Sequence, residues 1–213
     1  MRLIPIAMCL TALGPTTLRA ETFQADVWAD NWFEMRIDGI PIAEDSVPIT
    51  TERSFNAESF AFEAERPFTI GLVARDFIED DTGLEYIGTR RQQMGDGGVI
   101  LQIVDAAGRP VALSGADWLC QVIHAAPLDP ACAAEASPVA GEGACGFDIA
   151  EEPDGWDLPG SDASDWPQAT IYSPAAVDPK DGYDRIAWSP EAQFIWGPDL
   201  KRDNTILCRL TVE

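Results

Sequence analysis

The fold class is decided by the stretch Trp32-Phe33-Glu34-Met35-Arg36-Ile37-Asp38-Gly39-Ile40-Pro41-Ile42-Ala43, in a chain of 213 residues. From 32 to 37, apolar and polar residues alternate imperfectly, and a period of two is typical of a half-buried β-strand. Asp38-Gly39 follows, and Asp-Gly between two apolar runs is a strong signal for the tight turn of a β-hairpin. We therefore predict a hairpin over residues 32–43.

Similar short runs continue along the chain, separated by Gly, Pro and Asp. Ser59–Ala64 alternates cleanly, and Phe68–Ala74 is almost continuously apolar, as in a buried strand. Further strands are expected at 99–104, 111–113, 118–123, 169–172, 193–196 and 205–212. A short helix is expected near Ser161–Trp166, within a long Pro- and Gly-rich connection from 127 to 167. Many short strands with turn residues between them predict an all-β fold, an antiparallel β-sandwich.

The composition excludes some partners. Asp and Glu number 36 against 14 Lys and Arg, which gives a formal net charge of −22. Direct nucleic-acid binding is excluded, because neutralising a phosphate backbone needs a basic surface. The chain is 46% hydrophobic and 23% charged, which is a globular composition. Its length allows one large β domain or two small ones, and we favour a single domain over 21–213.

The N-terminus predicts export. Met1-Arg2 is a short positive start, Leu3–Gly14 is an apolar run, and Ala20 is a small residue before Glu21. This is the pattern of a secretory signal peptide over residues 1–20, so the mature protein is expected in the periplasm or secreted. A lipoprotein modified at Cys9 is the alternative. The apolar run is too short for a membrane span, and no later stretch approaches the roughly 20 apolar residues needed.

The cysteines agree with export. Cys9 leaves with the signal peptide, and an even set of four remains in a chain that reaches an oxidising compartment. Cys132 and Cys145 bracket a loop rich in Ala, Pro and Gly, whereas Cys120 and Cys208 each lie in a strand-like run. We therefore predict the disulfides Cys132–Cys145 and Cys120–Cys208. Zinc binding is the competing interpretation, but the chain has no Cys-x-x-Cys pair and a single histidine.

A family resemblance covers most of residues 25–213. The segment Ala29-Asp30-Asn31-Trp32-Phe33-Glu34-Met35-Arg36-Ile37-Asp38-Gly39 resembles a hairpin common in galactose-binding-like jelly-roll domains of secreted bacterial proteins. Later segments resemble other parts of the same domains: 68–74, Gly97–Leu101, Asp117–Cys120, Trp156, Asp165-Trp166, Ala169, Phe194–Trp196 and Asp203–Arg209. The resemblance implies a jelly-roll sandwich and, as the leading ligand class, carbohydrate or a cell-surface glycan. Some relatives carry an attached phosphatidylethanolamine-binding-like domain, which implies another exported protein as the alternative partner.

Signals for catalysis are weak. His124, the single histidine, has no nucleophile-elbow sequence near it, so we interpret it as structural. The segment Gly95-Asp96-Gly97-Gly98 lacks the Lys-Ser/Thr ending of a phosphate-binding loop. With 36 acids in the chain, carboxylate pairs of the glycosidase type arise too easily to be informative. A non-catalytic protein is the preferred interpretation, and a carboxylate-dependent extracellular hydrolase is the third hypothesis.

An acidic segment provides the one cofactor candidate. Asp76, Glu79, Asp80 and Asp81 concentrate the oxygen ligands that calcium prefers. The spacing is not that of an EF-hand, so a solvated acidic turn is favoured over a calcium site. No other cofactor is indicated.

Aromatic and polar residues near one predicted end of the sandwich form the candidate binding site. Seven Trp residues are many for this length, and sugars are bound by stacking on aromatic rings with polar side chains at their hydroxyls. Trp118, Trp166, Trp188 and Trp196 lie next to strand runs and are expected to fill the sandwich core or to cover its edges. The candidate ligand-binding residues are Trp28, Asp30, Asn31, Trp32, Arg90, Arg91, Gln92, Gln93 and Asp96.

Overall fold

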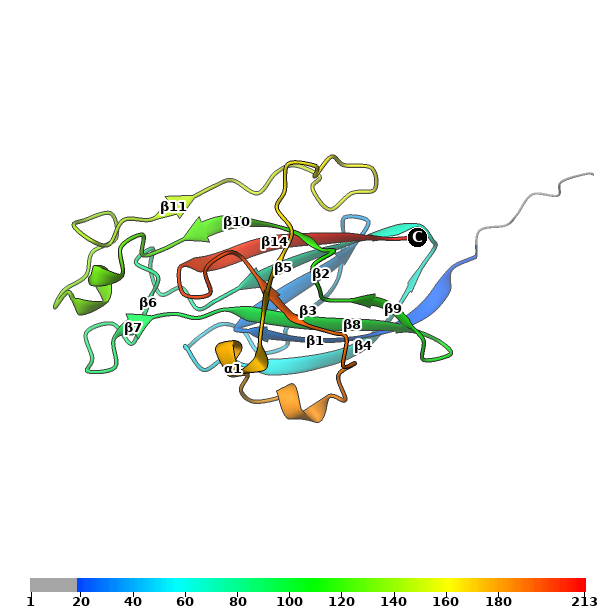
Figure 1. The fold of residues 1–213 in the computed structure, drawn as a ribbon, viewed down its shortest axis with the longest axis horizontal. Coiled ribbons are helices and arrows are strands. Elements are labelled where there is room, and N and C mark those ends of the chain that lie inside the picture. Colours follow the sequence, from blue (N-terminus) through cyan, green and yellow to red (C-terminus); the bar gives the residue numbers. More distant parts are fainter. Residues whose placement is uncertain (1–18) are drawn as a thin grey trace, which may run out of the picture.

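The structure is a computed structural model that describes residues 19–213, so the predicted signal peptide lies almost wholly outside the described residues. Two six-stranded antiparallel sheets pack face to face and are stacked vertically in Figure 1. The all-β sandwich is therefore confirmed. Within residues 19–213, no helix has the length and apolar character needed to cross a membrane.

The lower sheet in Figure 1, sheet A, has the strand order β12-β13-β8-β1-β4, with β9 also paired to β8. Its strands are β1 (Glu21–Asp30), β4 (Asn56–Ala64), β8 (Gly98–Asp105), β9 (Pro110–Leu113), β12 (Thr170–Tyr172) and β13 (Phe194–Trp196). Sheet A provides one wall of the main core through the inward residues of β1 and β8, such as Val27 and Leu101.

The upper sheet, sheet B, has the order β11-β10-β14-β5-β2-β3. Its strands are β2 (Trp32–Ile37), β3 (Ile40–Glu44), β5 (Phe68–Arg75), β10 (Leu119–Ala125), β11 (Asp148–Ile149) and β14 (Asp203–Val212). The predicted hairpin is present as β2 and β3, and Asp38 and Gly39 take positive φ values of 50° and 81° at its turn. Positive φ at both turn residues matches the right-handed twist of the two strands.

Two short elements and three helical turns complete the fold. A small hairpin, β6 (Leu84–Glu85) and β7 (Gln93–Met94), lies at the left end of the sandwich in Figure 1. The helical turns are η1 (Pro130–Ala134), α1 (Pro174–Val177) and η2 (Tyr183–Arg185). The helix expected near 161–166 is wrong: this segment forms turns, and Pro159 and Pro167 flank it. Strand β1, which the sequence analysis did not predict, pairs with β4 and β8 at the centre of sheet A.

Both predicted disulfides are confirmed. Cys120 and Cys208 face each other on the paired strands β10 and β14, with Cα atoms 4.1 Å apart. Cys132 and Cys145 close the loop at the left end of Figure 1, and both sulfurs pack against Leu84 of the small hairpin. One bridge therefore joins two strands of the core, and the other holds a loop to the small hairpin.

The outer faces of both sheets are covered by chain segments. On sheet B, Trp156 and Trp166 stack on each other and Trp156 packs on Val73 and Leu207. The guanidinium of Arg209 donates to the backbone oxygen of Ser161, which fixes this segment to the sheet. On sheet A, the segment 173–193 packs over Trp28, Ile100 and Phe194 and includes α1, which lies below the sheet in Figure 1. Each sheet face is therefore closed except where these segments leave a depression.

Candidate functional site

The sequence-predicted ligand residues at the β1–β2 junction are buried. Trp28 is 0% exposed, Asp30 3% and Asn31 0%. Trp28 lies on the outer face of β1 beneath the 173–193 segment, and its indole Nε1 donates to the backbone oxygen of Asp181 at 3.1 Å. These three side chains are enclosed by protein in this structure, and ligand binding by them stays a prediction from the sequence.

Trp32 and the arginine loop are apart from Trp28. Trp32 is half-buried on the opposite sheet face, where the Arg75 guanidinium lies 5.1 Å from its ring centroid. Arg90 and Arg91 are exposed in the β6–β7 loop, and the Arg91 guanidinium stacks 4.0 Å over the ring of Tyr86. The predicted residues therefore do not form one continuous aromatic binding surface.

The two glutamines of that loop have structural partners. The Gln92 amide donates to the backbone oxygens of Ala133 and Glu135, at 3.0 and 2.8 Å, and so connects the small hairpin to η1. The Gln93 amide donates to Glu85 Oε2 across the hairpin at 3.0 Å. These amides hold the loop in place through internal hydrogen bonds.

The structure does bring together four acids at this end, Asp30, Asp76, Glu85 and Asp96. Burial raises the pKa of Asp30 well above its ordinary value, and the charges of Asp96 and Glu85 raise it further. Burial also raises the pKa of Asp76, with Asp30 as the strongest neighbouring charge, and the Oδ2 atom of Asp76 has no hydrogen-bond partner. Burial raises the pKa of Glu85 to about 7. We call these four residues the acid cluster.

The predicted calcium ligands are separated by the structure. Asp76 is directed into the acid cluster, while Glu79 and Asp80 are exposed on the turn that follows. The carboxylate of Asp80 accepts the Thr82 backbone N–H at 2.9 Å, as in a solvated turn. Across the part of the chain that the structure describes, no three His, Cys, Asp or Glu side chains are grouped so as to hold a metal ion. Calcium binding by this segment stays a prediction from the sequence.

His124 contacts an amide, a carboxylate and an aromatic ring. Its Nδ1 is 3.1 Å from Asn204 Oδ1, and its Nε2 is 3.3 Å from Asp81 Oδ1. Phe147 stacks on its ring at a centroid distance of 6.5 Å. Thr205 is paired with His124 across β10 and β14, but none of the three contacts of the ring is with a hydroxyl or thiol. The contacts therefore fit the structural interpretation, because a nucleophilic site needs a Ser, Cys or Thr bonded to the imidazole.

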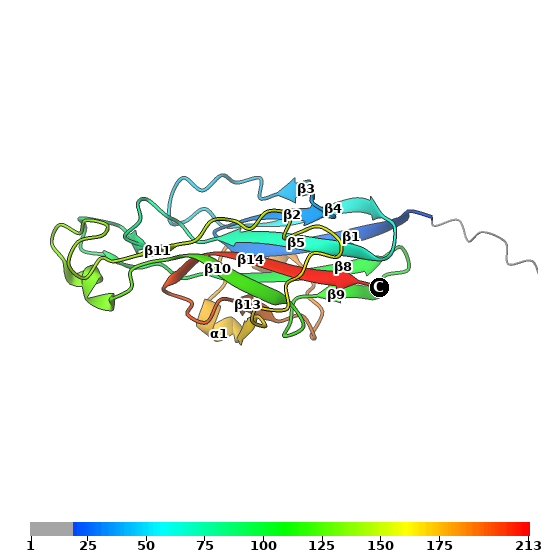
Figure 2. The same cartoon turned by 90° about the horizontal axis from the view of Figure 1, so that it is seen from above.

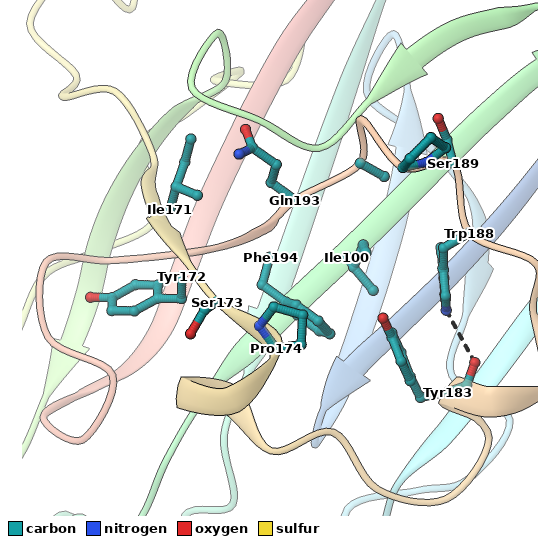
Figure 3. Close-up of a pocket in the computed structure, with 12 residues that line it drawn as sticks. Ile100, Ile171, Tyr172, Ser173, Pro174, Tyr183, Trp188, Ser189, Gln193 and Phe194 are labelled. Atoms are coloured by element: carbon teal, nitrogen blue, oxygen red, sulfur yellow. Dashed lines mark hydrogen bonds between the residues drawn. The ribbon is translucent and has the colours of Figure 1, made fainter.

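The pocket with the most aromatic lining lies elsewhere, on the outer face of sheet A. Its volume is about 550 Å³, and four of its twelve lining residues are aromatic. Figure 3 shows Tyr172, Tyr183, Trp188 and Phe194 around it, with Ile100 at its floor. The other lining residues are Ile171, Ser173, Pro174, Ser189, Pro190, Ala192 and Gln193. We call this depression the aromatic pocket.

The fold fixes the aromatic side chains of this pocket. Phe194 comes from β13 and Ile100 from β8, so both project from a buried part of sheet A. Tyr183 and Trp188 stack at 5.7 Å, and the Trp188 indole Nε1 donates to the Tyr183 backbone oxygen at 3.0 Å (Figure 3). Gly182, with φ of 93°, lets the chain approach the backbone of β4, where a Cβ would meet the Ala57 nitrogen at 2.6 Å. The stack is therefore rigid before any ligand arrives.

Comparisons with known proteins give no match: no protein-family model, curated protein or solved structure resembles this chain significantly.

Three of the four aromatic residues of this pocket were not predicted as binding residues, and the fourth, Trp188, was expected to fill the core or to cover an edge of the sandwich. Trp188 is only partly buried, with one side against Tyr183. A signal was available, because Tyr183 and Trp188 are large aromatic residues in a segment rich in Pro, Gly and Ser, and loops on a rigid scaffold commonly carry binding residues. Its position over β8 and β13 depends on tertiary packing, which the pattern does not contain.

Proposed function

We propose that this chain is a non-catalytic carbohydrate-binding protein of the periplasm or the cell exterior. The observation that carries the proposal is the aromatic pocket, where rigid rings and uncharged polar side chains lie together on the outside of a β-sandwich. Sugar rings have apolar C–H faces that stack on aromatic side chains, while amides and hydroxyls bind their hydroxyl groups.

The predicted export supports this setting. The two disulfides are typical of oxidising compartments, and strand β1 begins at Glu21, the first residue after the predicted signal peptide. The resemblance to galactose-binding-like domains proposes the same ligand class. The acid cluster does not line the aromatic pocket, so the proposed role of the pocket is binding without carboxylate chemistry.

Affinity electrophoresis tests the proposal. The protein is run in native gels containing one neutral polysaccharide each, such as galactan, mannan or a soluble β-glucan, and we expect at least one to retard it. The variant Trp188→Ala is expected to lose the retardation, because the exposed face of the stack disappears. Trp166→Ala is the matched control, since Trp166 is also a half-buried, stacked Trp but lies on the opposite sheet face.

The result is interpreted with thermal unfolding of all three proteins. Loss of retardation in folded Trp188→Ala, with retention in Trp166→Ala, supports the aromatic pocket as the site. Equal loss in both variants, or no retardation of the wild type by any polymer, contradicts the proposal.

A protein partner is the second candidate. Leu128 and Ile149 are 42% and 59% exposed, and both line a depression of about 540 Å³ beside Val122 and Ile123. Exposed apolar side chains around a depression are a feature of protein interaction sites. If this surface binds another exported protein, the pair Leu128→Ser and Ile149→Ser is expected to abolish co-purification of that protein while polysaccharide retardation is unchanged.

A further inference from the structure

We infer that the aromatic pocket accepts uncharged sugar residues and excludes sugars that carry a carboxylate, sulfate or phosphate group. This inference rests on the proposed function, because it names the class of sugar that the same pocket takes. It follows from the charge and hydrogen-bonding capacity of the lining, neither of which the sequence pattern contains.

The lining has no charged side chain. Its polar side chains are hydroxyls and one carboxamide, from Ser173, Ser189, Gln193 and the two tyrosines. An anionic group placed among these side chains loses water without gaining a cationic partner, and burying an unpaired charge is costly. Sites for carboxylates and phosphates typically supply Arg, whose planar group donates two parallel hydrogen bonds. No Arg or Lys is among the residues that line this pocket.

The residues next to the lining in sequence add repulsion. Asp178, Asp181, Asp184 and Glu191 are exposed acids of the covering segment, against the two cations Lys180 and Arg185. Lys180 is already paired with Asp178, and Glu191 Oε2 accepts a hydrogen bond from Ser189 Oγ at 3.1 Å. Because the chain has a net charge of −22, an anionic sugar is repelled at long range. In the pocket itself it finds no cationic side chain to pair with.

Gln193 is a polar side chain at the edge of the aromatic pocket. Its backbone is held by Ser114: the Gln193 N–H donates to the Ser114 oxygen at 2.9 Å, and the Ser114 hydroxyl donates to the Gln193 oxygen at 2.7 Å. Its carboxamide makes no hydrogen bond to any of residues 19–213 and is exposed. An amide offers both a donor and an acceptor, which a hydroxyl can use at once.

The Tyr183 hydroxyl is the second such group. Within the described chain it has no hydrogen-bond partner, whereas the Tyr172 hydroxyl already donates to the Gly197 oxygen at 2.8 Å. Burial, with a smaller contribution from the Asp184 charge, raises the pKa of Tyr183, so its hydroxyl stays a neutral donor. In Figure 3 the Tyr183 ring lies beside Ile100 and Phe194, whereas the Gln193 carboxamide points away from both and lies at the edge of the pocket near Ile171.

Matched polymer pairs test the inference. Each pair has the same ring stereochemistry and the same β-1,4 linkage and differs only in the group at C6: mannan with polymannuronate, and cello-oligosaccharides with cellouronate. Retardation or competition is measured at about 0.02 M and about 0.3 M salt, because long-range repulsion is screened at the higher concentration. The neutral member is expected to bind at least about tenfold more tightly than the acidic member at both concentrations, a difference of about 1.4 kcal/mol.

The variant Gln193→Glu adds one carboxylate to the lining without a large change in size. It is expected to weaken binding of the neutral polymer at least about tenfold, again about 1.4 kcal/mol. The reason is that the new carboxylate has to give up bound water when the ligand covers it. Gln168→Glu is the matched control, because Gln168 is exposed and outside the pocket. Thermal unfolding shows whether each variant is folded.

The outcomes separate the inference from the proposed function. If no polymer of either kind binds the wild type, the carbohydrate function itself is contradicted. If an acidic polymer binds as tightly as its neutral partner, or more tightly, the function stands and the exclusion of acidic sugars is overturned. If Gln193→Glu binds the neutral polymer as the wild type does, the assignment of the ligand to this side chain is overturned.

Discussion

Trp28 packs among rings on three sides: Phe55 stacks against it, and the edges of Tyr183 and Phe194 meet it at centroid distances of 6.1 and 5.8 Å. We expect Trp28→Ala to destabilise the protein by about 3 to 5 kcal/mol, the usual cost of deleting a large buried aromatic side chain. Urea unfolding measures this loss. Because Trp28 supports the aromatic pocket from below, Trp28→Phe is expected to keep polysaccharide binding at a smaller cost in stability. A Trp28→Phe protein that is fully stable but binds nothing would show that the indole itself contacts the ligand.

Asp76 determines the pH dependence of stability at the acid cluster. The folded-state pKa values of Asp30, Asp76 and Glu85 are raised, so between about pH 4 and each raised value the native state binds more protons than the unfolded chain. The contribution of these three groups to stability is therefore greatest at acidic pH and falls as pH rises, through about 7 for Glu85.

Asp76→Asn removes one of these charges and keeps Oδ1, which accepts the Phe77 N–H. We expect it to raise Tm at about pH 8 by about 2 to 4 °C, the shift that about 1 kcal/mol gives in a chain of this size. At about pH 5 the gain should be smaller, because the raised pKa values keep more of the wild-type carboxyl groups protonated than at about pH 8. Asp154→Asn is the matched control on an exposed acid. A gain that is equal at both pH values would contradict the buried-carboxyl argument.

The two disulfides stabilise different parts of the molecule: one joins two core strands, and the other closes a surface loop. Removing Cys120–Cys208, which closes a loop of 88 residues, is expected to cost about 4 kcal/mol by the chain-entropy argument. Removing Cys132–Cys145, with a separation of 13, is expected to cost about 3 kcal/mol or less. Paired Cys→Ala variants, compared by urea unfolding and limited proteolysis, measure both effects. We expect the variant without Cys132–Cys145 to be cleaved earliest within 130–147. The variant without Cys120–Cys208 is expected to lose global stability. The reverse pattern would mean that the loop bridge supports the core.

Strands were predictable wherever a turn residue marked their ends. Asp38-Gly39 located the β2–β3 hairpin, and the continuous apolar run of β5 located a strand that is buried on both faces. Strand β1 was missed although Phe23, Ala25, Val27 and Ala29 alternate toward the main core. Its other face carries Trp28, which is buried by a segment more than 140 residues away in sequence, as the Asp181 hydrogen bond with a separation of 153 shows. That face looks irregular in the sequence because its partner is not local.

The candidate site was less predictable than the fold, for the same reason. Asp30 and Asn31 look like surface polar residues in the sequence, but Asn31 is enclosed by Phe77, whose N–H it accepts at 2.5 Å, and by the backbone of Glu52. The aromatic pocket arises where β8 and β13 meet a segment without regular structure. Local patterns identify the strands, whereas the depth of a depression between a sheet and a loop depends on contacts between distant residues.

For the whole molecule, export is testable by mass. Intact-mass analysis of protein recovered from the periplasm or the medium should show loss of residues 1–20 and a new N-terminus at Glu21. Loss of Arg2 and Arg19 lowers the formal net charge from −22 to −24. The mass should also be four hydrogens below that of the reduced mature chain, because two disulfides form. A lipid-modified Cys9 at the new terminus, or an uncut chain, would contradict the predicted processing.

Strand β14 lies between β10 and β5 inside sheet B, although it comes last among the strands of the chain. Without β14, the strands β11 and β10 are not joined to β5, β2 and β3. The Cys120–Cys208 bridge also cannot form before β14 is in place, because Cys208 belongs to that strand. A chain that crosses a membrane N-terminus first would keep sheet B open until the end of its passage, since pairing between distant strands has to wait for both partners. If the predicted export occurs, this order would delay folding before the crossing and leave the sandwich to be completed in the oxidising compartment.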